Sequence, residues 1–234
     1  MGWNKYEILI STEYDFLYDL AKVLLDYYDF SIKIASNAIP NSLKQAEKLL
    51  HLLTKNKYML SGHLLKSKYN FITSDIKGAF NDVNGVLSVD SKNLEALMLK
   101  AMFCIESGDY PKAKEVINEA MITNRTETKE NSAFLILKAK CELGLNDTEN
   151  AQKSLNTALA HFDMNLHSDQ IARNSLFKLK HLDKLDLMKV NIDILLKLGN
   201  IEEAQTFMNK LVVEFQDLGD ELLMLHSDLA LKTD

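Results

Sequence analysis

The chain has 234 residues, of which 47% are hydrophobic and 26% charged, and its formal net charge is −6. It contains only 2 prolines and 8 glycines, roughly a third of the usual share of these residues. This scarcity excludes an all-β sandwich or barrel, because closely spaced strands need turns rich in Gly and Pro. The apolar fraction excludes the disordered and low-complexity classes, so composition predicts an all-α protein.

Other totals exclude several kinds of partner. Arg125 and Arg173 are the only arginines, whereas nucleic-acid binders concentrate Arg for contacts to phosphate and guanine. No apolar run reaches the roughly 18 residues of a membrane span, and the first residues lack the pattern of a signal peptide. Two cysteines are no disulfide framework and indicate a reducing compartment. We therefore expect a cytoplasmic protein with no nucleic-acid partner and no direct membrane insertion.

Residues 12–55 are predicted to form a first, stretched helical hairpin. One helix is expected over 13–28 and its mate over 42–53, with a connection between them over 29–40. The clearest hairpin follows later, over 93–120, where apolar residues recur at spacings of three and four on both sides of Gly108-Asp109. Gly108 suits the left-handed conformation that ends a helix, Asp109 can cap the next helix, and Pro111 fits its first turn.

The same hairpin pattern recurs along the chain. A small residue early in the second helix repeats at intervals of 33, 34, 38 and 53 residues, at Ala46, Ala79, Ala113, Ala151 and Ala204. The last four follow a turn pair at the matching offset: Ser74-Asp75, Gly108-Asp109, Asn146-Asp147 and Gly199-Asn200. A period of 34 is the tetratricopeptide signature, so we expect a right-handed superhelical solenoid of tetratricopeptide-type helical hairpins. The units of this single array are expected at 12–55, 59–91, 93–125, 131–163 and 183–216, with a half-unit at 219–234.

Two irregular spacings interrupt the array. Four extra residues over 124–130 predict a lengthened connection between repeats, and about 19 residues over 163–181 predict an insertion, read as a loop leading into a helical extension. In the last full repeat Ile192 and Leu211 replace the small residues of the other units, which predicts wider packing there. Ser67, Ala101 and Ala139 are expected at the small position of the first helix, and Ala120 and Ala158 at that of the second.

The C-terminal half-unit is expected to be a first helix without its mate. It offers Leu222, Leu225 and Leu229 as an apolar face, a candidate surface for binding protein. Terminal repeats normally carry a polar outer face, in contrast to this apolar helix. One alternative is a capping helix that packs back on its predecessor. The other is that this chain is a piece of a longer solenoid, cut in the middle of a repeat.

The sequence contains few motifs of catalytic or ligand-binding sites. No glycine lies within six residues of another, so no phosphate-binding loop is expected, and zinc motifs are absent. His161, His167 and His181 are interpreted as surface histidines near the insertion, and Cys104 and Cys141 as small buried hydrophobes. We therefore expect no enzymatic activity, no cofactor, no metal and no small-molecule substrate.

The groove of the array is the candidate site for protein partners. Its fifth and ninth repeat positions read Leu64 and Lys68, then Met98 and Met102, then Ile136 and Lys140. This pattern lacks the Lys, Asn and Arg with which some tetratricopeptide domains grip a terminal carboxylate. An apolar groove containing Met suits a packed helix or a hydrophobic peptide instead. The alternative is that these residues simply pack against neighbouring helices.

The ordered set of motifs resembles one family, the tetratricopeptide-repeat subunit of intraflagellar transport complex A, also called tetratricopeptide repeat protein 21. The resemblance covers nearly the whole chain from about Tyr14 and includes both irregular spacings. It is carried by the segments 15–27, 74–83 (Ser74-Asp-Ile-Lys-Gly-Ala-Phe-Asn-Asp-Val83), 93–120, 134–140 (Phe134-Leu-Ile-Leu-Lys-Ala-Lys140), 214–221 and 227–231.

The resemblance implies a ciliary and cytoplasmic scaffold, at the basal body or in the cilium, without enzymatic activity. Its implied partners are the other protein subunits of a transport complex that carries cargo from ciliary tip to base and helps proteins enter cilia. Members of the family are much longer than this chain, and no short catalytic motif is carried over. The alternative function is a stand-alone cytosolic tetratricopeptide adaptor that binds peptides.

Overall fold

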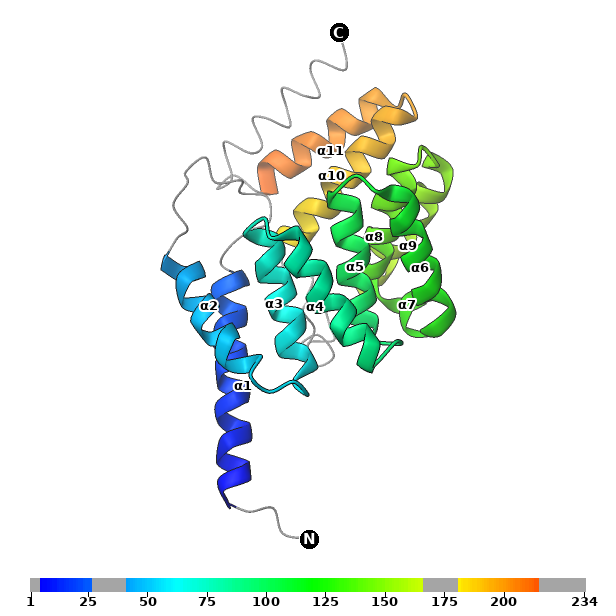
Figure 1. Cartoon of the computed structure of the whole chain (residues 1–234). Coiled ribbons are helices and arrows are strands. Elements are labelled where there is room, and N and C mark those ends of the chain that lie inside the picture. The colour runs from blue at the N-terminus through cyan, green and yellow to red at the C-terminus, as the bar shows by residue number, and fades with distance from the viewer. Residues whose placement is uncertain (1–4, 27–40, 166–180, 215–234) are drawn as a thin grey trace. The chain divides into compact units, whose positions relative to one another are not determined.

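The computed structural model describes residues 5–26, 41–165 and 181–214 (Figure 1). These residues form helices and turns, and none of them lies in a strand. The helices are α1 (Lys5–Asp26), α2 (Asn41–Leu53), α3 (Leu60–Ile72), α4 (Ile76–Val89), α5 (Leu94–Glu106), α6 (Tyr110–Thr123), α7 (Glu127–Glu130), α8 (Ser132–Gly144), α9 (Thr148–Asn165), α10 (His181–Lys197) and α11 (Ile201–Glu214). The predicted all-α class is confirmed.

The chain divides into two compact units, residues 1–103 and 104–234, and the division falls within α5. In the first unit α1 packs on α2 and α3 packs on α4, while α3 also contacts α2. In the second unit α8 pairs with α9 and α10 pairs with α11. Consecutive helices thus pack as hairpins, which is the arrangement of a helical-repeat solenoid.

Four turns between consecutive helices share one backbone geometry. In each, the first residue of the predicted turn pair has a positive φ: 67° at Ser74, 76° at Gly108, 61° at Asn146 and 77° at Gly199. At Gly108 the backbone N–H donates to Ile105 O at 2.9 Å, and the next N–H, of Asp109, donates to Cys104 O at 2.9 Å. This is the Schellman pattern that satisfies the last carbonyls of a helix, and the same two bonds recur at the other three turns.

The residue that follows each positive φ directly precedes the next helix. Three of these residues are aspartates whose side chains accept a hydrogen bond from the N–H three residues later: Asp75 from Gly78 at 2.9 Å, Asp109 from Lys112 at 3.2 Å and Asp147 from Asn150 at 3.4 Å. A cap of this kind satisfies a backbone donor that has no partner inside the helix. One turn therefore ends one helix and starts its mate within two residues.

The small residues predicted at the helix contacts are all buried. This set comprises Ala46, Ser67, Ala79, Ala101, Ala113, Ala120, Ala139, Ala151, Ala158 and Ala204. Side chains of this size let two helix backbones approach closely, so larger neighbours can pack around the contact. In the last hairpin, Ile192 and Leu211 are also buried; the wider packing expected there stays a prediction.

Helix α10 shows how hairpins stack in the second unit. One face, with Leu187, Val190 and Ile194, belongs to the core of α8 and α9. Another face, with Ile192 and Leu195, belongs to the core that α10 shares with α11. A first helix is therefore buried on two sides, against its own mate and against the preceding hairpin.

Two elements differ from the sequence-based expectation. Helix α1 begins at Lys5, eight residues before the predicted start, because no glycine or proline stands between Gly2 and Pro40 to end a helix. The lengthened connection over 124–130 contains a short helix, α7. Of the predicted insertion over 163–181, the first three residues belong to α9 and His181 begins α10, while the rest lies outside the described residues, as does the half-unit at 219–234.

Two exposed glycines predict opposite effects of the same substitution. A Cβ added at Gly85 in α4, or at Gly108, meets no heavy atom within 4 Å, so only backbone conformation differs between them. We expect Gly85→Ala to raise the free energy of unfolding by about 0.5–1 kcal/mol, because Ala loses less entropy in a helix. Gly108→Ala is expected to lower it by about 1–2 kcal/mol, because φ is positive there. Chemical denaturation of both variants tests this, and effects of equal sign would contradict the turn geometry.

Candidate protein-interaction surface

The predicted groove residues fall into two classes of exposure. The residues at the fifth repeat position are buried, and those at the ninth, one helical turn later, are half-buried. The buried residues are Leu64, Met98 and Ile136. The half-buried residues are Lys68, Met102 and Lys140. Only the half-buried set is accessible to a partner, whereas the buried set belongs to the core.

The described residues place the predicted groove residues on the first helices of successive hairpins. Lys68 in α3 and Met102 in α5 belong to the first unit, and Lys140 in α8 belongs to the second. Leu222, Leu225 and Leu229 lie outside the described residues. The protein-binding role of all nine residues stays a prediction.

A polar network that sequence reasoning missed joins α8 to α9. Lys138 Nζ donates to Ser154 Oγ at 2.7 Å, and Ser154 Oγ donates to Glu142 Oε2 at 2.8 Å. Lys138 Nζ also lies 2.8 Å from Glu142 Oε1, one helical turn along α8. Because Ser154 is only 4% exposed, these bonds satisfy a hydroxyl that water does not reach.

The same repeat positions form a second polar network, between α3 and α4. Asn70 Nδ2 donates to Asp82 Oδ2 at 2.8 Å, and Lys66 Nζ lies 3.6 Å from Asp82 Oδ1. Burial raises the pKa of the Asp82 carboxyl, and the positive charges of Lys66 and His63 oppose that shift only in part. In this network the effect of burial on the pKa of the Asp82 carboxyl is therefore larger than the opposing effect of its ion pair with Lys66.

One sequence signal connects the two networks. Lys66, Asn70 and Asp82 stand 72 residues before Lys138, Glu142 and Ser154. Because all these residues are polar, the periodicity of apolar residues does not indicate either network. The residue type also changes at two of the three positions, which hides their equivalence. A search for polar residues at equal repeat positions would have found them.

Both cysteines are buried, as predicted. Burial, with the charge of Glu142 as the next cause, raises the pKa of the Cys141 thiol from 9.0 to about 11. Cys141 Sγ also lies 3.5 Å from the carbonyl oxygen of Tyr110, to which it donates. A thiol in this state is a poor nucleophile, so Cys141 acts in packing rather than in chemistry.

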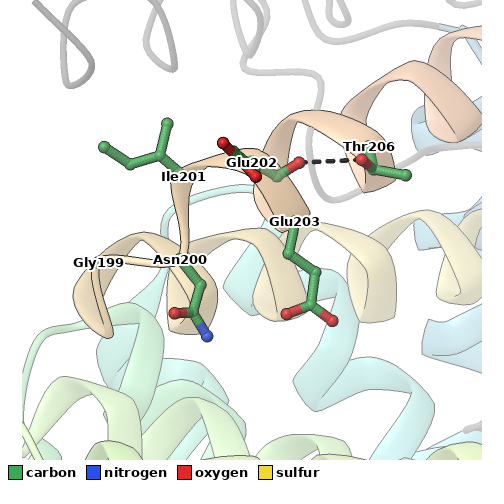
Figure 2. A pocket seen from close by; sticks show the side chains of 6 residues that line it. All are labelled: Gly199, Asn200, Ile201, Glu202, Glu203 and Thr206. Atoms are coloured by element: carbon green, nitrogen blue, oxygen red, sulfur yellow. Dashed lines mark hydrogen bonds between the residues drawn. The ribbon is translucent and has the colours of Figure 1, made fainter.

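A hollow of about 660 Å³ lies at the start of α11. Figure 2 shows its lining, which comes from the turn after α10 and the first turns of α11, with Glu202 and Glu203 as its charged side chains. Thr206 Oγ1 donates to the backbone oxygen of Glu202 at 2.9 Å. Acidic residues in a first turn stabilise the helix dipole. The hollow contains no nucleophile and base in hydrogen-bond contact, and it offers no catalytic arrangement.

A metal site and a membrane-spanning helix are both absent among the residues that the structure describes. These residues bring together no group of three or more His, Cys, Asp or Glu side chains suited to a metal ion. Within the same ranges, no helix combines the length and apolar character required to cross a membrane.

Two buried serines predict opposite effects of removing a hydroxyl. Ser154 makes two hydrogen bonds, whereas the Ser132 hydroxyl, in a residue 3% exposed, has none. We expect Ser154→Ala to lower the free energy of unfolding by about 1–2 kcal/mol. Ser132→Ala is expected to raise it by about 0.5–1 kcal/mol, because it removes a desolvated group without a partner. Urea titration of both variants tests this, and a larger loss for Ser132→Ala would show that the network is incidental.

Alkylation tests the state of Cys141. Its pKa of about 11, against 9.0 for a free thiol, lowers the thiolate fraction at pH 8 by about a hundredfold, and burial slows access further. We expect iodoacetamide to modify Cys141 at least about a hundred times more slowly in the folded chain than in the same chain in urea. Peptide mass mapping follows the modification, and similar rates in both states would contradict the burial.

Part of the chain is similar to a subunit of the signal recognition particle. An 84-residue stretch is 32% identical to the signal recognition particle subunit SRP72 of Homo sapiens, and to the same extent to that of Canis lupus familiaris. This stretch is 36% of the present chain and 12% of each relative, so the match spans a small part of those proteins.

A family model matches the C-terminal part of the chain, residues 127–234, and is described as the ARM repeat of tetratricopeptide repeat protein 21. The match begins at the first residue of α7, so it includes one short helix followed by the two longer helices α8 and α9. Armadillo-type repeats of two or three helices are longer than 34 residues, and the intervals of 38 and 53 residues that end at Ala151 and Ala204, in this part of the chain, are longer too. Residues 127–234 thus resemble the tetratricopeptide repeat protein 21 family that the ordered motifs indicated.

Proposed function

We propose that the chain is a non-enzymatic scaffold that binds other protein subunits of intraflagellar transport complex A. In this role it acts in retrograde ciliary transport and in the import of proteins into cilia, and it is located in the cytoplasm, at the basal body and in the cilium. The observation that carries the proposal is the match of residues 127–234 to the repeat of tetratricopeptide repeat protein 21.

The packing of the hairpins supports a role in binding protein. Stacked helices leave an extended surface, and repeat proteins use such surfaces for partners rather than for catalysis. In the second unit the core joins three successive helices, α8, α9 and α10, through Ala139, Leu155 and Ile194. A surface supported in this way keeps its shape when a partner binds, which lowers the entropy lost on association.

A stand-alone adaptor for hydrophobic peptides is the second candidate. The half-buried side chain of Met102 favours it, because Met is flexible and polarizable and adapts to varied apolar partners. In this role the chain would take a short helix or an extended peptide along the first helices, without belonging to a fixed complex.

One experiment separates these functions. The full chain, with an affinity and fluorescent tag, is expressed in ciliated cells beside the variant Met102→Glu. As a complex subunit, the chain is expected at the ciliary base and in cilia, and it copurifies with other complex A subunits whether or not Met102 is changed. As an adaptor, it recovers short hydrophobic segments, and Met102→Glu reduces that recovery at least about tenfold by placing a charge on the apolar contact.

Two results would contradict the proposed complex. One is a chain spread evenly through the cytoplasm that copurifies with no complex A subunit. The other is copurification with signal recognition particle components, which would give functional meaning to the similarity with SRP72.

A further inference from the structure

An exposed apolar stripe runs along α1 in the first unit. Phe16, Leu20 and Val23 recur at intervals of four and three residues, which places them on one face of the helix. Phe16 is 66% exposed and Val23 is 63% exposed, while Ala21 and Leu25 on another face are fully buried. Helix α1 therefore packs on its mate through one side and leaves a second apolar side uncovered.

The later hairpins show what covers this side of a first helix. Ala21 is small and buried, like Ser67, Ala101 and Ala139 in the later first helices. Aligned on these residues, Val23 corresponds to three residues that are all buried: Tyr69, Phe103 and Cys141.

Each of these three residues contacts the hairpin that precedes its own. Glu47 of α2 accepts a hydrogen bond from Tyr69, and this contact, after burial, raises the pKa of the Tyr69 hydroxyl. The ring of Phe103 stacks on Phe71 at 4.4 Å between centroids. Cys141 contacts Tyr110 of α6. The position of Val23 is therefore the one that receives a neighbouring hairpin.

One residue of α1 departs from the repeat. Asp19 stands where the later first helices carry the buried residues Leu65, Leu99 and Leu137. Glu13 and Asp15 are also exposed, and Lys22, the only cation within 13–25, is buried. The stripe is thus bordered by acids, and a hairpin with only apolar side chains at this contact would leave the Asp19 carboxylate desolvated and unpaired.

From these observations we infer that the stripe Phe16, Leu20 and Val23 is a stacking surface for a helical hairpin of another repeat protein. The docking helix carries an aliphatic centre, and a lysine or arginine beside that centre pairs with Asp19. A second copy that presented the same stripe would bring its own Glu13, Asp15 and Asp19 against these acids, so like charges would meet, and a second copy is not the occupant. This inference rests on a protein-binding repeat and not on ciliary transport, so the two are tested separately.

A synthetic probe tests this surface. The probe is a three-hairpin consensus tetratricopeptide array without its capping helix, made in two forms that carry Lys or Glu beside the exposed aliphatic residues of the last helix. Binding of each form to the full chain is measured by calorimetry. We expect the Lys form to bind at least tenfold more tightly than the Glu form, and Asp19→Lys to reverse that preference.

Two further variants locate the contact. Val23→Lys is expected to weaken binding of the Lys form at least tenfold. Val89→Lys, a matched change at a residue of α4 that is 68% exposed, is expected to leave it unchanged. Circular dichroism of all variants checks that they fold, and both substituted residues are exposed enough for this to hold.

Several outcomes would overturn the inference. These are failure of the unsubstituted chain to bind either form, equal losses for Val23→Lys and Val89→Lys, or equal binding of the Lys and Glu forms. Sedimentation supplies one more: a chain that is dimeric alone and becomes monomeric with Val23→Lys would assign the stripe to a second copy. None of these results bears on where the chain is located in the cell.

Discussion

The fold depends on a two-residue backbone constraint at each hairpin turn. A residue with positive φ follows the end of one helix, and the next residue directly precedes the other, so the turn restricts the relative position of the two helices. At all four turns the buried alanine of the second helix follows the residue with positive φ by five positions. Its N–H donates a hydrogen bond to the carbonyl oxygen of the residue that directly precedes the helix. Closest approach of the helices therefore occurs at a fixed distance from the turn, and the core is built outward from there.

Glycine is not required at this constraint. Ser74 and Asn146 adopt the left-handed conformation, in which an L residue other than glycine is strained. Asn is the more suitable of the two because its short polar side chain tolerates this region. At both turns the Schellman bonds and an aspartate cap accompany the strained residue, and tertiary packing holds the hairpin closed.

Local features of the fold were predictable from sequence, and features that depend on distant neighbours were not. Turn pairs and buried alanines follow from short-range spacing, so Gly108, Asp109 and Ala113 were placed correctly. The early start of α1 was missed although Asn4 and Glu7 have the spacing of a capping box, and α7 was missed because it is only 4 residues long and has no side-chain cap. The Lys138, Glu142 and Ser154 network was missed because its members look like ordinary surface residues until two helices face each other.

The exposure of the candidate binding residues could not be predicted from the sequence either. Leu64 and Met98 were chosen for their repeat position, yet in a stacked array the same position supplies core. Sequence periodicity identifies which helix face is turned inward but does not distinguish contact with a neighbouring repeat from contact with a partner. The stripe on α1 was not singled out either, because its apolar spacing resembles that of a buried face until exposure is known.

The two polar networks have a consequence for how the repeats find their neighbours. Hairpins with similar apolar faces can exchange partners during folding, a known failure of repeat proteins. Helix α8 paired with α6 would bury Lys138 and Glu142 without the Ser154 hydroxyl, and α3 paired with α6 would leave Asn70 without its acceptor. The equivalent positions of the hairpin between them carry Cys104 and Val116, which accept apolar neighbours more freely. Polar contacts at alternate hairpins thus favour second helices that supply a polar partner over α6, and they act against that misassembly of the array.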